Sequence, residues 1–211
     1  MPRTHAFDAH PGRYDHWFIE HEAAWVSELL ALRTLVPWTG EGLEIGVGTG
    51  RFAAPLGIAT GLDPSPAMLT HAAGRGIRVV EGRAEALPWA DATFDHALVV
   101  TTLCFVDDAA AMATEARRVL RPGGRLVLGF VDRGSPLGAE YLARQAASTF
   151  YQQATFFSAS EVEQLLADAG LVAETWGQTL FGSLSAVTEV QPVRPGRGEG
   201  GFTVVAARRP G

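Results

Sequence analysis

The chain has 211 residues, of which 47% are hydrophobic and 19% charged, and its formal net charge is −6. This length is enough for one full hydrophobic core, and the composition is typical of a globular chain and not of a disordered one. The net negative charge disfavours a nucleic-acid partner, which would require a basic face. We therefore expect one domain over residues 1–211 with a small molecule as its partner, and a monomer or homodimer.

Cys104 is the single cysteine. It excludes an internal disulfide and a multi-cysteine metal site, so no metal is expected, and it suits a reducing compartment. The sequence contains no run of about 18 apolar residues and no basic-then-apolar leader. These features predict a cytoplasmic protein without a membrane partner.

The N-terminal region divides into an arm and a helix. Residues 1–13 are rich in Pro, Gly and His and are expected to form a loose arm, whereas apolar residues recur at helical spacing from Tyr14 to Val36, before Pro37. Because this helix precedes the first strand, we expect residues 1–38 to form a lid over an α/β core at 39–211. Alternatively, Tyr14 and Trp17 only anchor the helix by packing.

A short apolar strand leads into the glycine-rich stretch from Leu43 to Phe52. Its glycines, Gly46, Gly48 and Gly50, are spaced two apart, as in a loop where the backbone turns with positive φ and a ligand lies against it. Glu44 precedes the first glycine by two positions, inside a strand that should be buried. An unpaired carboxylate there is costly, so we expect a cationic group to meet it.

Asp63 follows in the next expected strand, at residues 59–63. An acid at the end of the second strand of such a fold is placed to hydrogen-bond a ribose, as both NAD and S-adenosylmethionine require. A dinucleotide site would have a third glycine where this chain has Arg51. The connection from Arg51 to Gly57 contains Pro55 and leaves room for only a turn or two of helix.

The remaining pattern predicts further alternating strands and helices. Ser65 and Pro66 open a helix, Asp107 and Asp108 are expected to cap another, and Ser158 begins a capping box. The expected later strands cover residues 77–81, 94–102, 125–131, 172–180 and 202–208. Together these elements predict a Rossmann-like sheet of seven mostly parallel strands, with helices on both faces and the last strand antiparallel.

Three segments resemble the class I S-adenosylmethionine-dependent methyltransferases. Residues Glu44 to Gly50 match motif I of that family, (D/E)-x-G-x-G-x-G, position by position. Residues 82–89 resemble the segment G-D-A-E-x-L-P-F, with Arg83 in place of the acid, and the text EARRVLRPGGRLVL at 115–128 is a typical segment after the motifs. The resemblance covers about Tyr14 to the C-terminus and is strongest from Leu43 to Val131.

The resemblance implies S-adenosylmethionine as cofactor and direct in-line transfer of its methyl group to a nucleophilic atom of a small molecule. The residues that it implies for cofactor binding are Glu44, Gly46, Gly48, Gly50, Asp63, Pro64, Met68, Ala84, Glu85 and Thr101. The candidate catalytic residues are Tyr14, His16 and Thr102, with His21 a further candidate for a general base. Aromatic residues at 132–157 are expected to line the substrate side, and the loop 182–201 is a second candidate lid.

Plainer interpretations stay open for several of these residues. Met68 is equally suited to the core, Glu85 to the solvated surface, and a lone histidine to packing. Two other functions also remain: a nicotinamide-dependent oxidoreductase, which Arg51 and the lack of an evident Tyr-x-x-x-Lys pair oppose, and a non-catalytic S-adenosylmethionine-binding protein.

Overall fold

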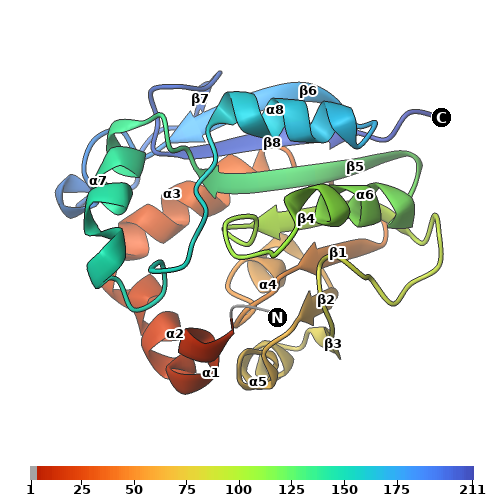
Figure 1. The fold of residues 1–211 in the computed structure, drawn as a ribbon, viewed down its shortest axis with the longest axis horizontal. Helices are drawn as coiled ribbons and strands as arrows, with labels where there is room; N and C mark the ends of the chain where they lie inside the picture. Colours follow the sequence, from red (N-terminus) through yellow and green to blue (C-terminus); the bar gives the residue numbers. More distant parts are fainter. Residues whose placement is uncertain (1–3) are drawn as a thin grey trace.

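The computed structural model describes residues 4–211, and across these residues eight strands form one sheet in the order β3-β2-β1-β4-β5-β8-β6-β7 (Figure 1). The first five strands pair in parallel, whereas β8 lies antiparallel between β5 and β6. The expected fold class is confirmed, with one short strand more than predicted. The strands are β1 (Gly42–Ile45), β2 (Thr60–Asp63), β3 (Arg78–Glu81), β4 (Phe94–Val100), β5 (Leu120–Val131), β6 (Val172–Thr179), β7 (Arg194–Pro195) and β8 (Phe202–Arg208).

Helices cover both faces of the sheet, as Figure 1 shows. Alternate residues of β4 belong to different hydrophobic clusters: Leu98 and Val100 face α3, α4 and α5, while Ala97 and Val99 face α6 and α8. Burial on both faces is what a central parallel strand requires. The helices are α1 (His5–Ala9), α2 (Pro11–Glu20), α3 (Glu22–Arg33), α4 (Ala53–Leu56), α5 (Pro66–Gly74), α6 (Ala109–Val119), α7 (Pro136–Arg144) and α8 (Ala159–Asp168).

Several predicted helix starts are confirmed by their capping bonds. The Ser65 hydroxyl accepts from the Met68 backbone N–H at 3.2 Å, and Ser158 forms the expected capping box with Glu161. Asp108 caps α6 by accepting from the Ala111 N–H at 3.0 Å. Each bond satisfies a backbone donor that the first turn of a helix otherwise leaves unpaired.

The N-terminal prediction was wrong in two respects. Part of the expected loose arm is helical and forms α1, while residues 1–3 lie outside the described part of the chain. The single helix expected from Tyr14 to Val36 is divided at His21, whose φ of −119° and ψ of 42° are not helical.

The two halves of that region also differ in burial. In α3 the residues Ala24, Ala31 and Leu32 are fully buried against the sheet, so α3 is a core helix and not a lid. By contrast, α1 buries no residue and α2 buries only Phe18. We call α1 and α2, residues 5–20, the cover.

Two strand boundaries also differ from the prediction. The segment from Arg121 to Gly124, expected as a turn before the fifth strand, is a bulge inside β5: Phe94 pairs with Leu120 and His96 with Arg125. The loop at 182–201 contains β7, which pairs with β6 at the sheet edge. Within residues 4–211, no helix is both long and apolar enough to cross a membrane.

Candidate functional site

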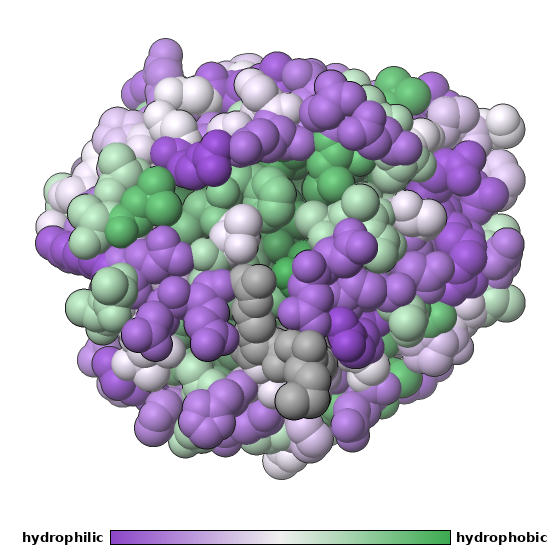
Figure 2. All heavy atoms as spheres, in the orientation of Figure 1, coloured by the Kyte–Doolittle hydropathy of each residue, from purple (hydrophilic) through white to green (hydrophobic). Residues whose placement is uncertain are grey.

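The first cavity lies at the carboxyl ends of β1, β2 and β4, beneath the cover, and contains ≈ 710 Å³ of empty space, part of it open to solvent. Parallel α/β sheets bind ligands at this edge. Figure 2 shows a hollow with apolar residues near the middle of the face seen in Figure 1, bordered by hydrophilic residues. The predicted residues that line the first cavity are Tyr14, Gly46, Gly48, Asp63, Pro64, Met68, Ala84, Glu85, Thr101 and Thr102.

The three glycines of the loop all have positive φ, and they have different tasks. A Cβ atom on Gly46 would lie 2.2 Å from the Thr102 side chain, and one on Gly50 would lie 2.5 Å from Ile77. At Gly48 the nearest atom to such a Cβ would be 3.7 Å away, on Tyr14, which is an ordinary van der Waals contact, and Gly48 lines the first cavity. Gly48 therefore leaves room for a ligand, whereas Gly50 lies outside the cavity lining and serves packing.

Asp63 connects the end of β2 to the glycine loop. Its Oδ2 accepts from the Gly48 N–H and its Oδ1 from the Ser65 N–H, both at 2.9 Å. Burial raises the pKa of Asp63 to about 6, and the two backbone hydrogen bonds oppose that rise. Because each carboxylate oxygen can accept more than one hydrogen bond, the positioned carboxylate can still receive a pair of ligand hydroxyls.

Glu44 is 1% exposed and lies outside the residues that line the cavity. The Ala53 backbone hydrogen-bonds this carboxyl group, but its Oε2 has no partner among residues 4–211. Burial raises the pKa of Glu44 well above its ordinary value. Residues 4–211 thus supply no cationic partner of the expected kind, and a cofactor-binding role for Glu44 stays a prediction.

The lining of the first cavity also includes a charged cluster, Arg83, Glu85 and Asp107, that the sequence did not predict. The Arg83 guanidinium donates to Asp107 at 2.8 Å and to Glu85 at 3.4 Å, and Glu85 also accepts from the Asp107 N–H at 2.8 Å. Glu85 is therefore not a solvated surface acid. Asp107 was expected to cap the next helix, and instead it anchors Arg83.

Thr101 and Thr102 directly follow β4 and line the first cavity, so the strand ends two residues earlier than the predicted 94–102. Thr101 has a φ of 49°, which is costly for a β-branched residue, and such strain is common where a backbone is held for function. The Thr102 hydroxyl lies within hydrogen-bond distance of two carbonyl oxygens, those of Gly46 at 3.1 Å and Val100 at 3.0 Å. Thr102 thereby holds the glycine loop against β4, which gives its hydroxyl a structural task.

Of the predicted catalytic residues on the N-terminal helix, only Tyr14 reaches the cavity. Burial raises the pKa of the Tyr14 hydroxyl, and the charges of Asp63 and Glu44 raise it further, so the phenol is neutral at physiological pH. His16 is largely exposed and lies 3.6 Å from Glu20, and His21 stacks on Trp17. Neither histidine lines the cavity, so the structure does not support the prediction that one of them acts as a base.

An ion-pair network joins the cover to the glycine loop. Asp15 accepts two bonds from Arg51, at 2.9 and 2.6 Å, and two from Arg75, both at 2.9 Å. Arg75 also donates to the Thr49 carbonyl at 2.8 Å. Burial alone would raise the pKa of Asp15, but the hydrogen bonds lower it to about 2. The sequence showed only that Arg51 stands in the third-glycine position and not what it binds.

A second cavity with ≈ 1040 Å³ of empty space, partly open to solvent, adjoins the first. The two share the lining residues Phe7, Tyr14, Thr101 and Phe105. The expected aromatic segment at 132–157 contributes Tyr141, Phe150 and Tyr151 to the second cavity, while Phe156 and Phe157 line a smaller one nearby. The loop at 182–201 lines none of these three cavities.

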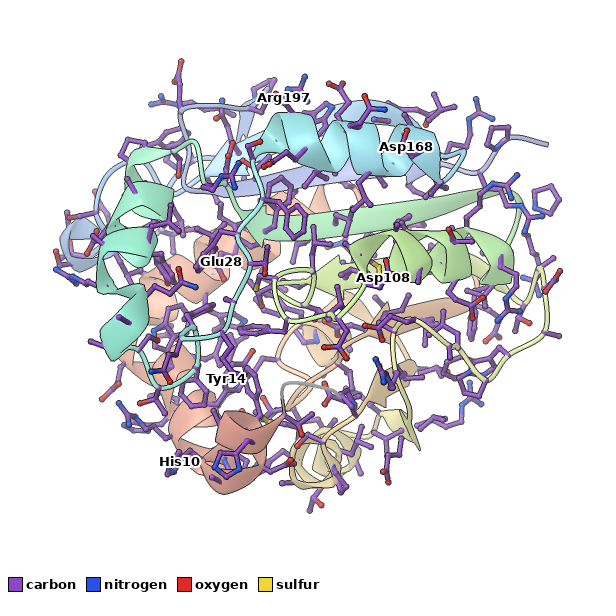
Figure 3. The ribbon with its side chains drawn as sticks, viewed as in Figure 1. His10, Tyr14, Glu28, Asp108, Asp168 and Arg197 are labelled. Carbon is purple, nitrogen blue, oxygen red and sulfur yellow. The ribbon has the colours of Figure 1, made fainter. Side chains whose placement is uncertain are left out.

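The second cavity contains a buried acid that sequence reasoning missed. Glu28 of α3 is 6% exposed, and burial raises its pKa to about 8. Figure 3 shows Glu28 on α3 and Tyr14 on α2. The signal was present in the sequence, because Glu28 lies four residues after Ala24 and four before Leu32, on the apolar face of the helix.

Comparison with known proteins gives consistent findings. A family model described as a methyltransferase domain matches residues 43–128. The chain is 42% identical to an uncharacterized protein of Methanocaldococcus jannaschii, over 96% of this chain and 98% of that protein. It is 32% identical to a ubiquinone/menaquinone biosynthesis C-methyltransferase of Desulfotalea psychrophila, over 84% of this chain and 85% of the relative.

A solved structure from Thermotoga maritima is also similar. It is described as a SAM-dependent methyltransferase and possible histamine N-methyltransferase. The two chains are 46% identical and superpose with a TM-score of 0.95, over 98% of this chain and 99% of the other.

Proposed function

The chain belongs to the class I S-adenosylmethionine-dependent methyltransferases, and on that premise we propose that it methylates a nucleophilic atom of a small molecule bound in the second cavity. The observation that carries this proposal is the junction of the two cavities. They meet at Tyr14 and Thr101, at the carboxyl end of β4, so ligands in both would be adjacent there.

The residues of the first cavity fit the cofactor that the family uses. Gly48 presents backbone without a side chain to the cavity, and Asp63 offers carboxylate oxygens for ribose hydroxyls. When bound, S-adenosylmethionine supplies a methyl group on a sulfonium, whose loss leaves a neutral thioether. The leaving group is thus already activated, and the protein has to align the acceptor and exclude water.

The cover and the aromatic lining serve to exclude water from the reacting groups. Phe7 of α1 contacts the rings of Tyr14, Phe105 and Phe150, at centroid distances of 5.6, 5.0 and 5.3 Å. These contacts close the space over the junction with apolar groups. A lid of this kind has to open for ligand exchange, in keeping with the low burial of α1 and α2.

The family leaves the acceptor open, because its members named above include a C-methyltransferase and a possible N-methyltransferase. The size of the second cavity, and its lining of aromatic residues with a few polar groups, support a small molecule. A cytoplasmic enzyme without a nucleic-acid or membrane partner, acting as a monomer or homodimer, remains our proposal. The nicotinamide alternative is not retained, since the family assignment opposes it.

Two measurements test this function. In calorimetry, S-adenosylhomocysteine should bind and NADH should not. In a turnover assay, S-adenosylhomocysteine should form from S-adenosylmethionine only when a methyl acceptor is added from a small-molecule panel. Binding without acceptor-dependent turnover across the panel would favour the non-catalytic alternative, and absence of binding would reject the proposal.

A further inference from the structure

The Glu28 carboxyl is in an unusual situation for a buried acid. Within residues 4–211 no hydrogen bond or ion pair reaches it, and burial is the physical cause of its raised pKa. It nevertheless lines the second cavity, so a molecule in that cavity can reach it. A buried acid without a partner is destabilising, and natural structures rarely keep one unless it has a ligand or a reaction to serve.

The surroundings of Glu28 are aromatic. The rings that line the second cavity with it are Phe7, Tyr14, Phe105, Tyr141, Phe150 and Tyr151. The charge of Glu28 contributes to the raised pKa values of Tyr14, Tyr141 and Tyr151, so these three phenols lie within its electrostatic range and are neutral. Aromatic faces attract cations, most strongly where water is excluded.

The other charged groups of the cavity lie on α2. Arg13 donates to the Thr149 hydroxyl at 3.2 Å in an exposed contact, and Glu20 is partnered by His16 at 3.6 Å. Neither of these residues pairs with Glu28. Arg13 is thus a cation of the same lining that does not pair with Glu28, and the acid shares this lining with six aromatic rings.

We propose that the methyl acceptor is an amine, and that Glu28, which lines the second cavity together with the aromatic rings, receives its ammonium group and takes up its proton. This inference rests on the proposed methyl transfer and names its substrate class. An amine in solution is an ammonium ion at neutral pH and has no lone pair with which to attack, so a nearby acceptor for its proton is needed.

An ammonium R–NH₃⁺ gives one proton to the Glu28 carboxylate and becomes R–NH₂. Its nitrogen lone pair then forms the new N–CH₃ bond while the S–CH₃ bond breaks and its electron pair stays on sulfur. The products are R–NH₂CH₃⁺, the neutral thioether and protonated Glu28, which holds the proton until product leaves.

The proposal makes a prediction about protons that does not depend on turnover. Because burial raises the pKa of Glu28 to about 8, Glu28 is mostly protonated in the free protein at pH 7, and the free amine is an ammonium ion. In the complex, the amine and the Glu28 carboxyl group together hold one proton fewer than they hold when separate, whether the proton they keep lies on nitrogen or on oxygen. Binding should therefore release about 0.9 proton at pH 7 and about half a proton at pH 8, and affinity should rise roughly tenfold from pH 6 to pH 7.

Calorimetry measures this release. The protein, saturated with S-adenosylhomocysteine, is titrated with 2-phenylethylamine, tyramine and tryptamine in buffers of different ionisation enthalpy, and the matched alcohols 2-phenylethanol, tyrosol and tryptophol serve as neutral controls. We expect at least one amine to bind more tightly than its alcohol, with proton release only for the amine. If no amine binds, or if amine and alcohol bind equally without proton release, the inference is wrong.

Two variants locate the effect. Glu28→Gln should weaken amine binding by about 10- to 150-fold, the loss expected for one charge-assisted hydrogen bond, and should abolish proton release. The alcohols and S-adenosylhomocysteine should bind as before. Glu22→Gln, an exposed change on the same helix, should alter nothing.

If Glu28 has only a structural role, amine binding should release as many protons in Glu28→Gln as in the wild-type protein. That result would overturn the inference. Failure of S-adenosylhomocysteine to bind the wild-type protein would instead count against the proposed function. If the Glu28→Gln variant folds poorly, the wild-type titration with amines and alcohols, and its pH dependence, still test the inference.

Discussion

Replacing Asp15 with asparagine should release the cover from the glycine loop. Asp15 keeps only 16% of its side chain exposed, and Arg51 and Arg75 keep 17% and 26%, so solvent screens these ion pairs only in part. The pKa of Asp15 falls from 3.8 to about 2. Since one pKa unit corresponds to about 1.4 kcal/mol, the network favours the charged, closed arrangement by about 2 kcal/mol.

Loss of this network should lower the free energy of opening the cover more than the free energy of global unfolding, because α1 and α2 bury so few residues. Asp15→Asn should weaken S-adenosylhomocysteine binding by up to roughly 30-fold, if the full 2 kcal/mol is lost. It should also speed hydrogen exchange at residues 5–20, with little change at α3 or β4. In the wild-type protein these residues should exchange readily without ligand and slowly with it.

The pH dependence provides a second check on the ion pairs of Asp15 with Arg51 and Arg75. A carboxyl group whose pKa is depressed in the folded state contributes stability above its unfolded pKa, near 3.8, and loses that contribution as the pH falls towards 2. The effect of Asp15→Asn should therefore be constant from pH 6 to pH 8. Asp91→Asn removes another aspartate that pairs with arginine, but one that is 75% exposed, and should leave both readouts unchanged.

Unchanged ligand affinity and unchanged exchange at residues 5–20 in Asp15→Asn would refute this reasoning. A fall in the melting temperature with uniform loss of protection would also refute it, since the cover would then belong to the cooperative core.

Three further changes test the site itself. Gly48→Val should abolish S-adenosylhomocysteine binding in calorimetry, because the side chain would enter the first cavity. As a control, Gly76→Val places the same side chain at another positive φ, where nothing lies within 4 Å, and should leave binding intact. Equal losses of binding in both variants would contradict the assignment of the first cavity to the cofactor. Asp63→Ala removes a charged acceptor for the ribose and should weaken the same binding by about 10- to 150-fold; a loss under threefold would place the ribose elsewhere. Glu28→Gln should raise the melting temperature more at pH 8 than at pH 5. The folded-state pKa of Glu28 is raised, so the wild-type protein loses folding stability as the pH rises from 4.5 towards 8, and glutamine does not. An equal shift of the melting temperature at both pH values would show that Glu28 is not a neutral buried acid.

The sequence predicted the features that depend on neighbouring residues. The glycine loop, the caps at Ser65 and Ser158 and the buried β4 strand follow from local spacing and residue type, and all are present. The added strand β7 escaped notice because its two residues pair only through contact with β6, which no local pattern shows.

The candidate site was less predictable, because side-chain direction decides it. Tyr14 and Phe18 lie four residues apart and share the inner face of α2, whereas His16, two positions from Tyr14, points to solvent. This helical spacing was available in the sequence and would have excluded His16 as a base. The partners of Arg51 and the cavity around Glu28 depend instead on contacts between residues distant in the chain, so they required the structure.

The most direct test of the central claim is transfer of a labelled methyl group. The protein would be incubated with S-adenosylmethionine carrying a trideuterated methyl group and with a panel of small molecules that offer nitrogen, oxygen, sulfur or carbon nucleophiles, amines among them, and mass spectrometry would quantify both products. We predict equal amounts of S-adenosylhomocysteine and of one trideuteromethylated acceptor, with neither formed by Gly48→Val. Labelled cofactor that binds but is recovered intact with every acceptor would contradict the claim that this site transfers methyl groups.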